Sequence, residues 1–263
     1  MLQQPRAMTI AGSDSGGGAG IQADLKTFAA FGVYGTSAIT AVTAQNTREV
    51  TQVLEMPAQI ICDQIDAIMV DIGTDVVKTG MLFSTQIIQA VLSKIEEHQL
   101  NLVVVDPVMI AKSGHRLLQP EAVDALKQLL PFATVVTPNI VEAEVLAGRS
   151  INTLGEVREA ARVIHALGPK AVIVKGGHLS GNEVVDLLFD GQDFTQVVGE
   201  RVRSDNTHGT GCTFAAAVAA GLSKGVVVQQ ALTDAKQYVS AGIRHSFYIG
   251  AGHGPLNHFY HWW

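Results

Sequence analysis

Short apolar runs alternate along this chain with segments of helical periodicity. The clearest run, Leu102–Val105, ends at Asp106, and its continuous apolar character is typical of a strand buried on both faces of a parallel sheet. Segments 60–72 and 87–95 repeat apolar residues every three or four positions, which predicts amphipathic helices. Because no linker or internal repeat interrupts the alternation, we expect one doubly wound α/β domain over residues 1–263, with a mostly parallel central sheet and helices on both faces.

The composition limits the partners that such a domain can have. The chain carries a net charge of −6 and has no cluster of Lys and Arg, which argues against a nucleic acid partner. The sequence lacks both a long apolar run and an N-terminal signal core, so we expect no contact with a membrane. Cys62 and Cys212 give neither a metal-binding spacing nor a disulfide framework, and Cys62 is expected in the core. We therefore expect a cytoplasmic protein that acts on small molecules.

Six glycine-rich or polar signals stand where predicted strands end. They are Gly12, Gly80, Asp106, Asn139, Lys175 and the turn 209–212. The carboxyl ends of parallel strands meet at one edge of an open α/β sheet, and ligands bind at that edge. We therefore expect the six signals to form one site.

The turn Thr207–Cys212 leads into an alanine-rich predicted helix. Backbone N–H groups at a helix N-terminus have no intrahelical partner, and the helix dipole there favours an anion. Gly209, Thr210, Gly211 and Cys212 are therefore candidates for a phosphate cradle, although a glycine-rich turn before a buried helix explains the same sequence. Because Cys212 lies in the first helical turn, its thiol pKa is expected to be lowered.

A second glycine-rich loop, Gly12–Gly20, connects the first predicted strand to a helix. It lacks the Gly-Lys-Ser/Thr of a P-loop, and Ile21 stands where a dinucleotide fingerprint needs glycine, so both nucleotide motifs are excluded. Asp24 either points back towards this loop or is a solvated acid at the helix start. The 15–20 loop and segment 110–118 are candidates for lids over the substrate, because both hold glycines in polar surroundings.

Three other polar residues admit purely structural explanations. Gln45 follows the predicted strand 34–44, where the polar residues form either a turn or an edge that binds a heterocyclic ring. Asn139 and Glu142 are the expected N-cap and third residue of a helix, and a capping arrangement explains both without any ligand.

Phosphoryl transfer fits this inventory best, because its catalysis consists mainly of positioning and charge neutralisation. Lys175 would neutralise phosphate oxygens, and the 209–212 amides would hold the transferred γ-phosphoryl group. Asp106 and Glu142 would hold Mg²⁺ through its water ligands.

Two other classes of function stay open. A Cys–His hydrolase would use Cys212 as nucleophile and His208 or His178 as base, but it leaves the N-terminal loop and the acids without a role. A non-catalytic ligand-binding regulator on the same fold is the other class.

With these residues assembled, the chain resembles the ribokinase-like superfamily, and within it the hydroxymethylpyrimidine/phosphomethylpyrimidine kinases. The resemblance follows the family's order along nearly the whole chain. Its motifs lie at 11–26, 40–47, 78–81, 106–108, 137–143, 175–178, 207–212 and 252–259.

The resemblance implies a ribokinase-like fold, a homodimer and a two-step reaction with ATP and Mg²⁺ in thiamine biosynthesis. The hydroxymethyl group of 4-amino-5-hydroxymethyl-2-methylpyrimidine is phosphorylated first, and the monophosphate is then converted to the diphosphate. On the substrate side the matching residues are Gly12, Asp24, Gln45, Met81 and Val108, with Gln45 bonded to the pyrimidine. On the nucleotide and Mg²⁺ side they are Asn139, Glu142, Lys175, Thr207 and Lys236.

The resemblance also assigns a role to Cys212. Sugar kinases of the superfamily usually carry an Asp base at this position, whereas the pyrimidine kinases are similar to this chain in having Cys. A thiolate with a lowered pKa would serve as base for the substrate hydroxyl.

The alternative within the family is a pyridoxine/pyridoxal kinase of vitamin B6 salvage. That branch tends to carry Met at the position of Gln45. The amide of Gln45 suits an aminopyrimidine edge, which has a donor beside an acceptor, so we expect the pyrimidine as substrate with side activity on pyridoxine. The tail 258–263 is expected to pack on the surface without binding metal.

Overall fold

The computed structural model describes residues 4–110, 114–178 and 181–262. Its strands are β1 (Arg6–Asp14), β2 (Tyr34–Gln45), β3 (Val50–Glu55), β4 (Val76–Thr79), β5 (Val103–Val105), β6 (Val135–Val136), β7 (Val172–Val174), β8 (Glu183–Phe189) and β9 (Phe194–Glu200). Its α-helices are α1 (Gly20–Ala30), α2 (Ala58–Asp71), α3 (Thr85–Glu97), α4 (Val123–Leu129), α5 (Ile140–Ala147), α6 (Leu154–His165), α7 (Thr210–Ser223) and α8 (Val228–Arg244).

The strands form one nine-stranded sheet in the order β3-β2-β1-β4-β5-β6-β7-β8-β9. Strands β2, β1, β4, β5, β6 and β7 run parallel, whereas β3, β8 and β9 are antiparallel to their neighbours. The prediction of a doubly wound, mostly parallel sheet is confirmed.

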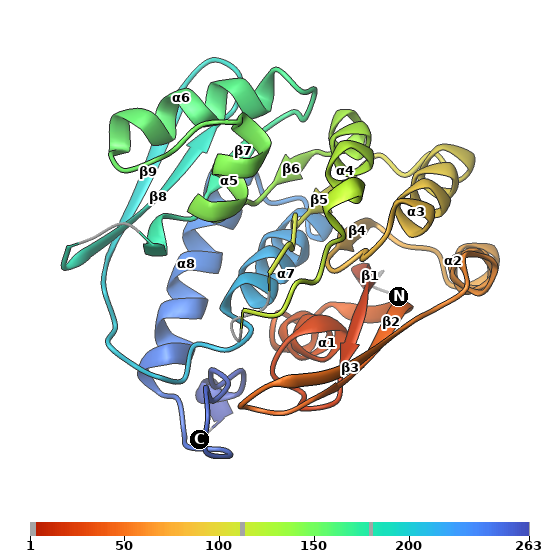
Figure 1. Cartoon of the computed structure of the whole chain (residues 1–263), viewed down its shortest axis with the longest axis horizontal. Coiled ribbons are helices and arrows are strands. Elements are labelled where there is room, and N and C mark those ends of the chain that lie inside the picture. Colours follow the sequence, from red (N-terminus) through yellow and green to blue (C-terminus); the bar gives the residue numbers. More distant parts are fainter. Residues whose placement is uncertain (1–3, 111–113, 179–180, 263) are drawn as a thin grey trace.

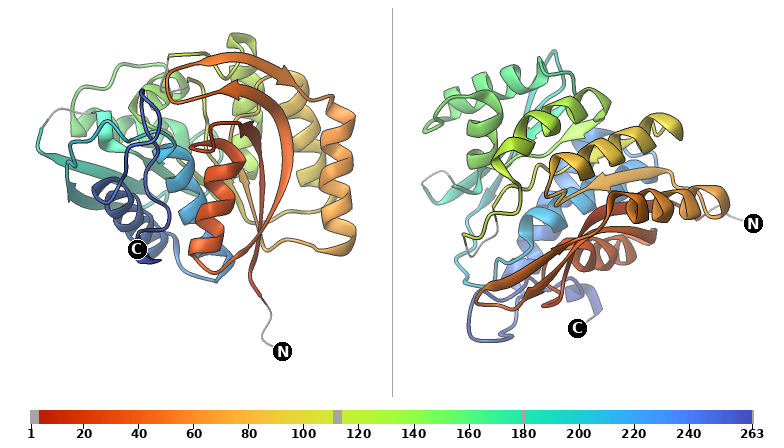
Figure 2. Two further views of the ribbon diagram at one scale, coloured as in Figure 1. Left: turned by 90° about the horizontal axis from the view of Figure 1, so that it is seen from below. Right: turned by 45° about the vertical axis from the view of Figure 1, so that its right-hand side comes forward.

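Helices cover both faces of this sheet (Figures 1 and 2). Helices α1, α7 and α8 bury Phe28, Phe214 and Leu232 against one face. Helices α2 to α6 contribute to a separate core on the other face, in which Ile61 and Ile87 are fully buried. The central strands therefore have apolar side chains on both faces, which explains the continuous apolar runs of the sequence.

The chain changes direction across the sheet at β1. From β1 it goes to β2 and β3 on one side, and it then returns to β4 and continues outward to β9. Such a switch point leaves a crevice at the carboxyl ends of the two strands that flank it, which are β1 and β4 in this sheet. The topology therefore places the predicted site beside Asp14, at the end of β1, and Thr79, at the end of β4.

Two expectations about packing were wrong. Cys62 lies on α2 and is only half-buried, so it is not a core residue. In the tail, His258 is buried, and its Nε2 lies 2.9 Å from Thr213 Oγ1 of α7. The tail comes this close because Gly242 on α8 has no side chain, and a Cβ there would stand 2.7 Å from Leu256 Cδ1.

The structure does not test whether the two predicted lids, 15–20 and 110–118, close over the substrate. Of the predicted lid 110–118, residues 111–113 lie outside the described part, and Ile110 pairs with Arg116 in an isolated bridge. Closure of this segment or of the 15–20 loop stays a prediction. None of the helices in the described part of the chain is long and apolar enough to cross a membrane.

Candidate active site

A cavity of about 750 Å³ opens at the carboxyl ends of the parallel strands. All six strand-end signals line it, and so do most of the other predicted site residues. Its lining includes Gly12, Gln45, Gly80, Met81, Asp106, Val108, Asn139, Glu142, Lys175, Thr207, Gly209, Thr210, Gly211, Cys212 and Lys236. The prediction that separate strand ends converge on one site is confirmed.

Asp24 is the exception among the predicted site residues. It has no exposed surface and accepts hydrogen bonds from Thr9 Oγ1 at 2.6 Å and from Lys78 Nζ at 2.9 Å. Burial raises the pKa of Asp24, while the ammonium of Lys78 opposes that rise. The expectation that Asp24 is a solvated acid is wrong. The predicted contact of Asp24 with the substrate ring is also corrected, because Asp24 instead binds Lys78, which itself lines the cavity.

Lys78 was not predicted as a site residue, although its position in the sequence indicates a buried, paired charge. It follows Val76 and Val77 in the fully buried strand β4, where a lysine needs a partner for its charge. Its partner Asp24 comes from α1, 54 residues earlier. The pair brings a fixed positive charge to the floor of the cavity.

The N-terminus of α7 lies at the cavity, at the residues predicted as an anion cradle. Gly209 adopts a left-handed conformation with φ of 80°, and a Cβ there would collide with the carbonyl oxygen of Gly18. Within the described residues, no side chain caps α7. The N–H of Thr210 donates to the carbonyl oxygen of Thr207 at 3.4 Å, which leaves the N–H groups of Gly211 and Cys212 as the open donors of the first turn. A Cβ at Gly211 would lie 3.4 Å from Lys175 Nζ, which places this ammonium beside the cradle.

Lys175 is held at the cavity by Asp106. Its Nζ lies 2.9 Å from Asp106 Oδ1, which also accepts a hydrogen bond from Thr137 Oγ1 at 3.2 Å. Burial is the largest influence and acts to lower the pKa of Lys175, but the charges of Asp106 and Glu142 and the hydrogen bond to Asp106 together outweigh it, and the pKa is raised. The ammonium is therefore charged and available to a phosphate group.

Asn139 and Glu142 form the predicted capping box at the start of α5. The backbone N–H of Asn139 donates to Glu142 Oε2 at 2.8 Å, and the N–H of Glu142 donates to Asn139 Oδ1 at 3.0 Å. Both residues also line the cavity, so capping and ligand binding do not exclude each other. Burial is the main cause that raises the pKa of Glu142, with Lys175 opposing it.

The cavity brings together donor groups that suit a nucleotide and Mg²⁺. Two carboxylates, Asp106 and Glu142, stand beside Lys175 and the open amides of α7. Oxygen ligands are those that Mg²⁺ prefers, and ammonium and amide groups suit phosphate oxygens. The residues present therefore fit both groups.

Cys212 lies at the start of α7 as predicted, but the expected lowering of its pKa is wrong. Burial of the thiol raises its pKa to about 11, although the charge of Lys78 and the N–H of Gly20 act in the opposite direction. Asp24 and Asp106 add to the rise. Desolvation and two nearby carboxylates therefore outweigh the stabilisation of the thiolate by Lys78 and by the Gly20 N–H.

The cavity also contains a chain of contacts that runs from Gln45 through His208 to Asp14. Neither His208 nor Asp14 was predicted to bind a ligand. His208 Nε2 lies 3.0 Å from Asp14 Oδ2 and 3.3 Å from Gln45 Nε2. The signal for Asp14 and His208 was their position inside the two glycine-rich loops. Of the two bases considered for the hydrolase alternative, His208 and His178, the first contacts Asp14 and Gln45 through its Nε2.

Lys236 lies at the β8 side of the cavity. Its Nζ bonds Asp186 Oδ2 at 2.8 Å and the carbonyl oxygen of Val184 at 2.9 Å. The side chain is nearly buried, and a Cβ at Gly199 would approach its Cε to 3.0 Å. Lys236 therefore provides a third fixed cation, after Lys78 and Lys175, at the end of the cavity that lies across the sheet from Gln45.

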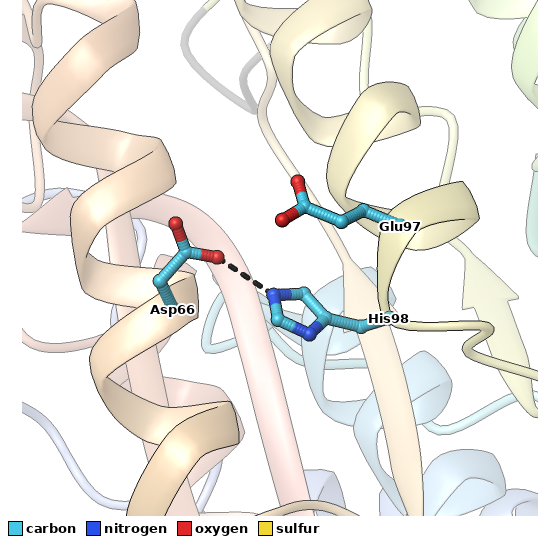
Figure 3. A group of neighbouring side chains, drawn as sticks. All are labelled: Asp66, Glu97 and His98. Atoms are coloured by element: carbon cyan, nitrogen blue, oxygen red, sulfur yellow. Dashed lines mark hydrogen bonds and ion pairs between the residues drawn. The ribbon is translucent and has the colours of Figure 1, made fainter.

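A second group of possible metal ligands lies away from this cavity, between α2 and the end of α3. Asp66, Glu97 and His98 approach one another there, and His98 Nε2 is 2.6 Å from Asp66 Oδ1 (Figure 3). Lys94 Nζ bonds both carboxylates at 2.7 Å. Because one ammonium bonds both acids, this cluster is explained as an ion-pair network.

Comparisons with known proteins agree with the site. The sequence profile of the phosphomethylpyrimidine kinase family matches residues 14–257. The chain is 51% identical to the hydroxymethylpyrimidine/phosphomethylpyrimidine kinase of Rhizobium meliloti, over 98% of each chain. It is 53% identical to the thiamine biosynthesis bifunctional protein of Geobacter sulfurreducens over 95% of its own length, and it spans 51% of that longer protein.

Among solved structures, the chain is similar to an ADP complex of Bacillus subtilis pyridoxal kinase. The TM-score is 0.91 at 43% identity, with 98% of each chain covered. That likeness confirms the fold. The family match includes the turn Thr207–Cys212, most of the Gly12–Gly20 loop and every strand-end signal except Gly12. The chain therefore belongs to the phosphomethylpyrimidine kinase family.

Proposed function

We propose that the protein uses ATP to phosphorylate 4-amino-5-hydroxymethyl-2-methylpyrimidine, and then its monophosphate, in thiamine biosynthesis. The observation that carries this proposal is the order of groups along the sheet edge. Gln45 is the last residue of β2, Gly12 lies within β1 and Met81 follows β4, whereas Asp106 and Lys175 follow β5 and β7. The cavity therefore has a ring-binding end and a phosphate-binding end, with Cys212 between Lys78 and Lys175.

In this arrangement, Gln45, Gly12, Met81 and Val108 would hold the pyrimidine. Asn139, Thr207 and Lys236 would serve the nucleotide, and Lys175 would neutralise charge on its phosphates. The amides of Gly209, Thr210, Gly211 and Cys212 would hold the γ-phosphoryl oxygens. These donors are fixed before the substrate arrives, which is the condition under which electrostatic stabilisation of a transition state is strongest.

Asp106 and Glu142 would hold Mg²⁺ through its waters. The ion would neutralise charge on the nucleotide phosphates when bound. For Asp106, the ammonium of Lys175 occupies Oδ1, so Oδ2 is the atom left for a metal-bound water. For Glu142, the N–H of Asn139 occupies Oε2, and the backbone of Met109 also donates to this carboxylate.

Cys212 would take the proton from the substrate hydroxyl at Sγ. In the ligand-free protein the thiol holds its own proton, because burial raises its pKa to about 11. The thiol must therefore lose this proton before it can act as a base, and the nearby ammonium of Lys78 stabilises the resulting thiolate. This requirement makes the activity of Cys212 dependent on pH.

The direct test compares ATP consumption with the hydroxymethylpyrimidine, its monophosphate and pyridoxine side by side. We expect consumption with the first two and slower consumption with pyridoxine. No consumption with any of the three would refute the kinase proposal and favour the regulator. Faster turnover of pyridoxine than of the pyrimidine would favour the vitamin B6 alternative, which the likeness to the pyridoxal kinase structure supports.

We also propose, from the family resemblance, that the protein is a cytoplasmic homodimer formed by a single ribokinase-like domain. Sedimentation of the purified protein tests the dimer, and cell fractionation tests the location.

A further inference from the structure

At the β2 end of the cavity, the Gln45 amide is part of a chain of polar contacts. His208 Nε2 lies 3.0 Å from Asp14 Oδ2 and 3.3 Å from Gln45 Nε2, and Gln45 Oε1 lies 3.1 Å from Thr43 Oγ1. Asp14 and Thr43 are buried, and little of the His208 side chain is exposed. In such surroundings a donor that faces a donor is costly, so the direction of each hydrogen bond can be worked out.

Asp14 sets the direction of the first bond. Its carboxylate accepts backbone N–H groups from Gly16 at 2.8 Å, Gly18 at 3.0 Å and Ala19 at 2.8 Å. Burial acts to raise the pKa of Asp14, but the bonds from His208 and from these amides outweigh it, and the pKa is lowered. An ionised carboxylate has no hydrogen to donate, so His208 Nε2 carries the hydrogen between them.

With His208 Nε2 protonated, the amide nitrogen of Gln45 sets a second donor against it. A protonated Nε2 of His208 cannot accept a hydrogen bond from the amide nitrogen of Gln45. The other tautomer removes that conflict but sets an unprotonated Nε2 against the carboxylate of Asp14. With the amide turned over, its oxygen faces His208, and the one hydrogen on Nε2 is shared between the Asp14 carboxylate and this oxygen in a three-centre hydrogen bond.

The turned amide also fits its other neighbour. Thr43 Oγ1 donates its hydrogen to the carbonyl oxygen of Ser13 at 3.1 Å, so it is free to accept one from the amide nitrogen of Gln45. Each donor from Asp14 to Ser13 then faces an acceptor. One N–H and one lone pair of the Gln45 amide remain, and an aminopyrimidine edge offers their complement.

We propose that Asp14 and His208 are positioning residues that fix the orientation of the Gln45 amide and thereby select the ring edge that the cavity accepts. The proposal rests on the proposed function, because it takes Gln45 as the ring-binding residue. It adds a physical role for the contact between the two loops. The His208 ring packs so closely on Gly18 that a Cβ there would collide with it, and Gly209 meets Gly18 in the same way.

The hydrogen-bond direction is tested without any substrate. Long-range ¹H–¹⁵N NMR on the labelled full chain reports which ring nitrogen of His208 carries hydrogen, and the His208→Ala spectrum provides the assignment. We expect a protonated Nε2 at pH 8. An unprotonated Nε2 overturns the proposal, whether or not the protein proves to be a kinase.

The effect on selection is tested by calorimetric binding of hydroxymethylpyrimidine and pyridoxine to the unaltered protein, Asp14→Asn and His208→Ala. We expect each variant to lose about tenfold in affinity for the aminopyrimidine and clearly less for pyridoxine. Equal losses for both ligands would show a merely structural role and overturn the proposal. Binding of neither ligand by the unaltered protein would reject the proposed function, and the NMR result would still decide the hydrogen-bond direction.

His98→Ala is the matched control. It removes a histidine that contacts a carboxylate, Asp66, at 2.6 Å, but this pair lies between α2 and the end of α3 and does not line the cavity. Both affinities are expected to stay unchanged. Thermal unfolding of all variants separates loss of fold from loss of selection.

Discussion

Lys78 and Asp24 form an ion pair at 2.9 Å in which neither side chain is exposed to solvent. The pair links α1 to β4 beneath the cavity, and Thr9 Oγ1 adds a third hydrogen bond to Asp24 at 2.6 Å. A buried pair of this kind is costly to break, because removal of one partner leaves the other charge without compensation.

Lys78→Met is therefore expected to lower the free energy of unfolding by about 3–5 kcal/mol. The double variant Lys78→Met/Asp24→Leu should recover most of that loss, because it leaves no buried charge. Urea denaturation measures both changes. Asp75→Asn is the control, since its partner Arg6 is partly exposed and such pairs contribute about 1 kcal/mol or less. A loss at Lys78 as small as that at Asp75 would contradict the account.

Glu142 is expected to make the stability of the protein depend on pH. Burial raises its pKa from 4.5 to about 7, so its contribution to stability is present below pH 4.5 and is lost as the pH rises to about 7. Glu142→Gln can make the same capping contacts but has no titrating carboxyl, so this loss of stability with rising pH does not occur in it. Its stability relative to the unaltered protein should therefore increase between pH 4.5 and 7, as measured by urea denaturation at several pH values.

Glu156 offers a control of opposite sign. It closes the matching capping box with Thr153 at the start of α6, where hydrogen bonds from Asn152 and Thr153 lower its pKa. Its contribution is present above pH 4.5 and is lost as the pH falls. Glu156→Gln should therefore lose stability relative to the unaltered protein as the pH rises through the acid range. Parallel profiles for both variants would show that the Glu142 environment is not the cause.

Local capping of this kind could be predicted from the sequence, as could the convergence of strand ends. Asp106 and Lys175 each follow a continuous apolar run, and the rules for parallel sheets bring such positions together without any knowledge of side chains. The pairing of Asp24 with Lys78 could not be predicted in this way, because it joins residues 54 positions apart whose side chains meet only once α1 packs on the sheet.

The same limit explains the error at Cys212. A helix N-terminus lowers a thiol pKa in general, and this effect can be predicted from the position of the cysteine in the sequence. Whether burial and the carboxylates of Asp24 and Asp106 reverse the effect depends on tertiary packing. The contact of Asp14 with His208 spans 194 residues, and for the same reason only the structure brings it to Gln45.

Cys212 should become more reactive as the pH rises. Because the thiol pKa is raised to about 11, the thiolate fraction grows about tenfold for each pH unit below that value. Alkylation of Cys212 by iodoacetamide in a Cys62→Ser background, followed by mass spectrometry, is expected to accelerate steadily between about pH 7 and 10. A rate that levels off below pH 8 would show a lowered pKa instead.

Replacement of the same residue tests its role as base. Cys212→Ala is expected to lower kcat at least about a hundredfold, the lower limit for loss of a general base, with little change in ATP affinity. Single-turnover assays and nucleotide titration separate the two quantities. Turnover near that of the unaltered protein would remove Cys212 as base and leave positioning by the cradle as the source of catalysis.

Gln45→Met tests the residue that separates a pyrimidine kinase from a vitamin B6 kinase. Methionine fills the same space but offers no hydrogen bond to the ring, and it leaves His208 and Thr43 without their amide partner. We expect kcat/KM for the aminopyrimidine to fall by the equivalent of about 1–3 kcal/mol, the cost of a buried polar group left unpaired.

The fall at Gln45 should be specific to the ring. Turnover of pyridoxine should change less, so the ratio of the two kcat/KM values is the quantity to measure. Gln59→Met is the control, because Gln59 is an exposed glutamine on α2 whose amide bonds Asp63 at 2.9 Å, and it does not line the cavity. Unchanged selectivity in Gln45→Met would mean that backbone groups and Met81 choose the ring, and that the amide chain from Asp14 serves only to hold the two loops together.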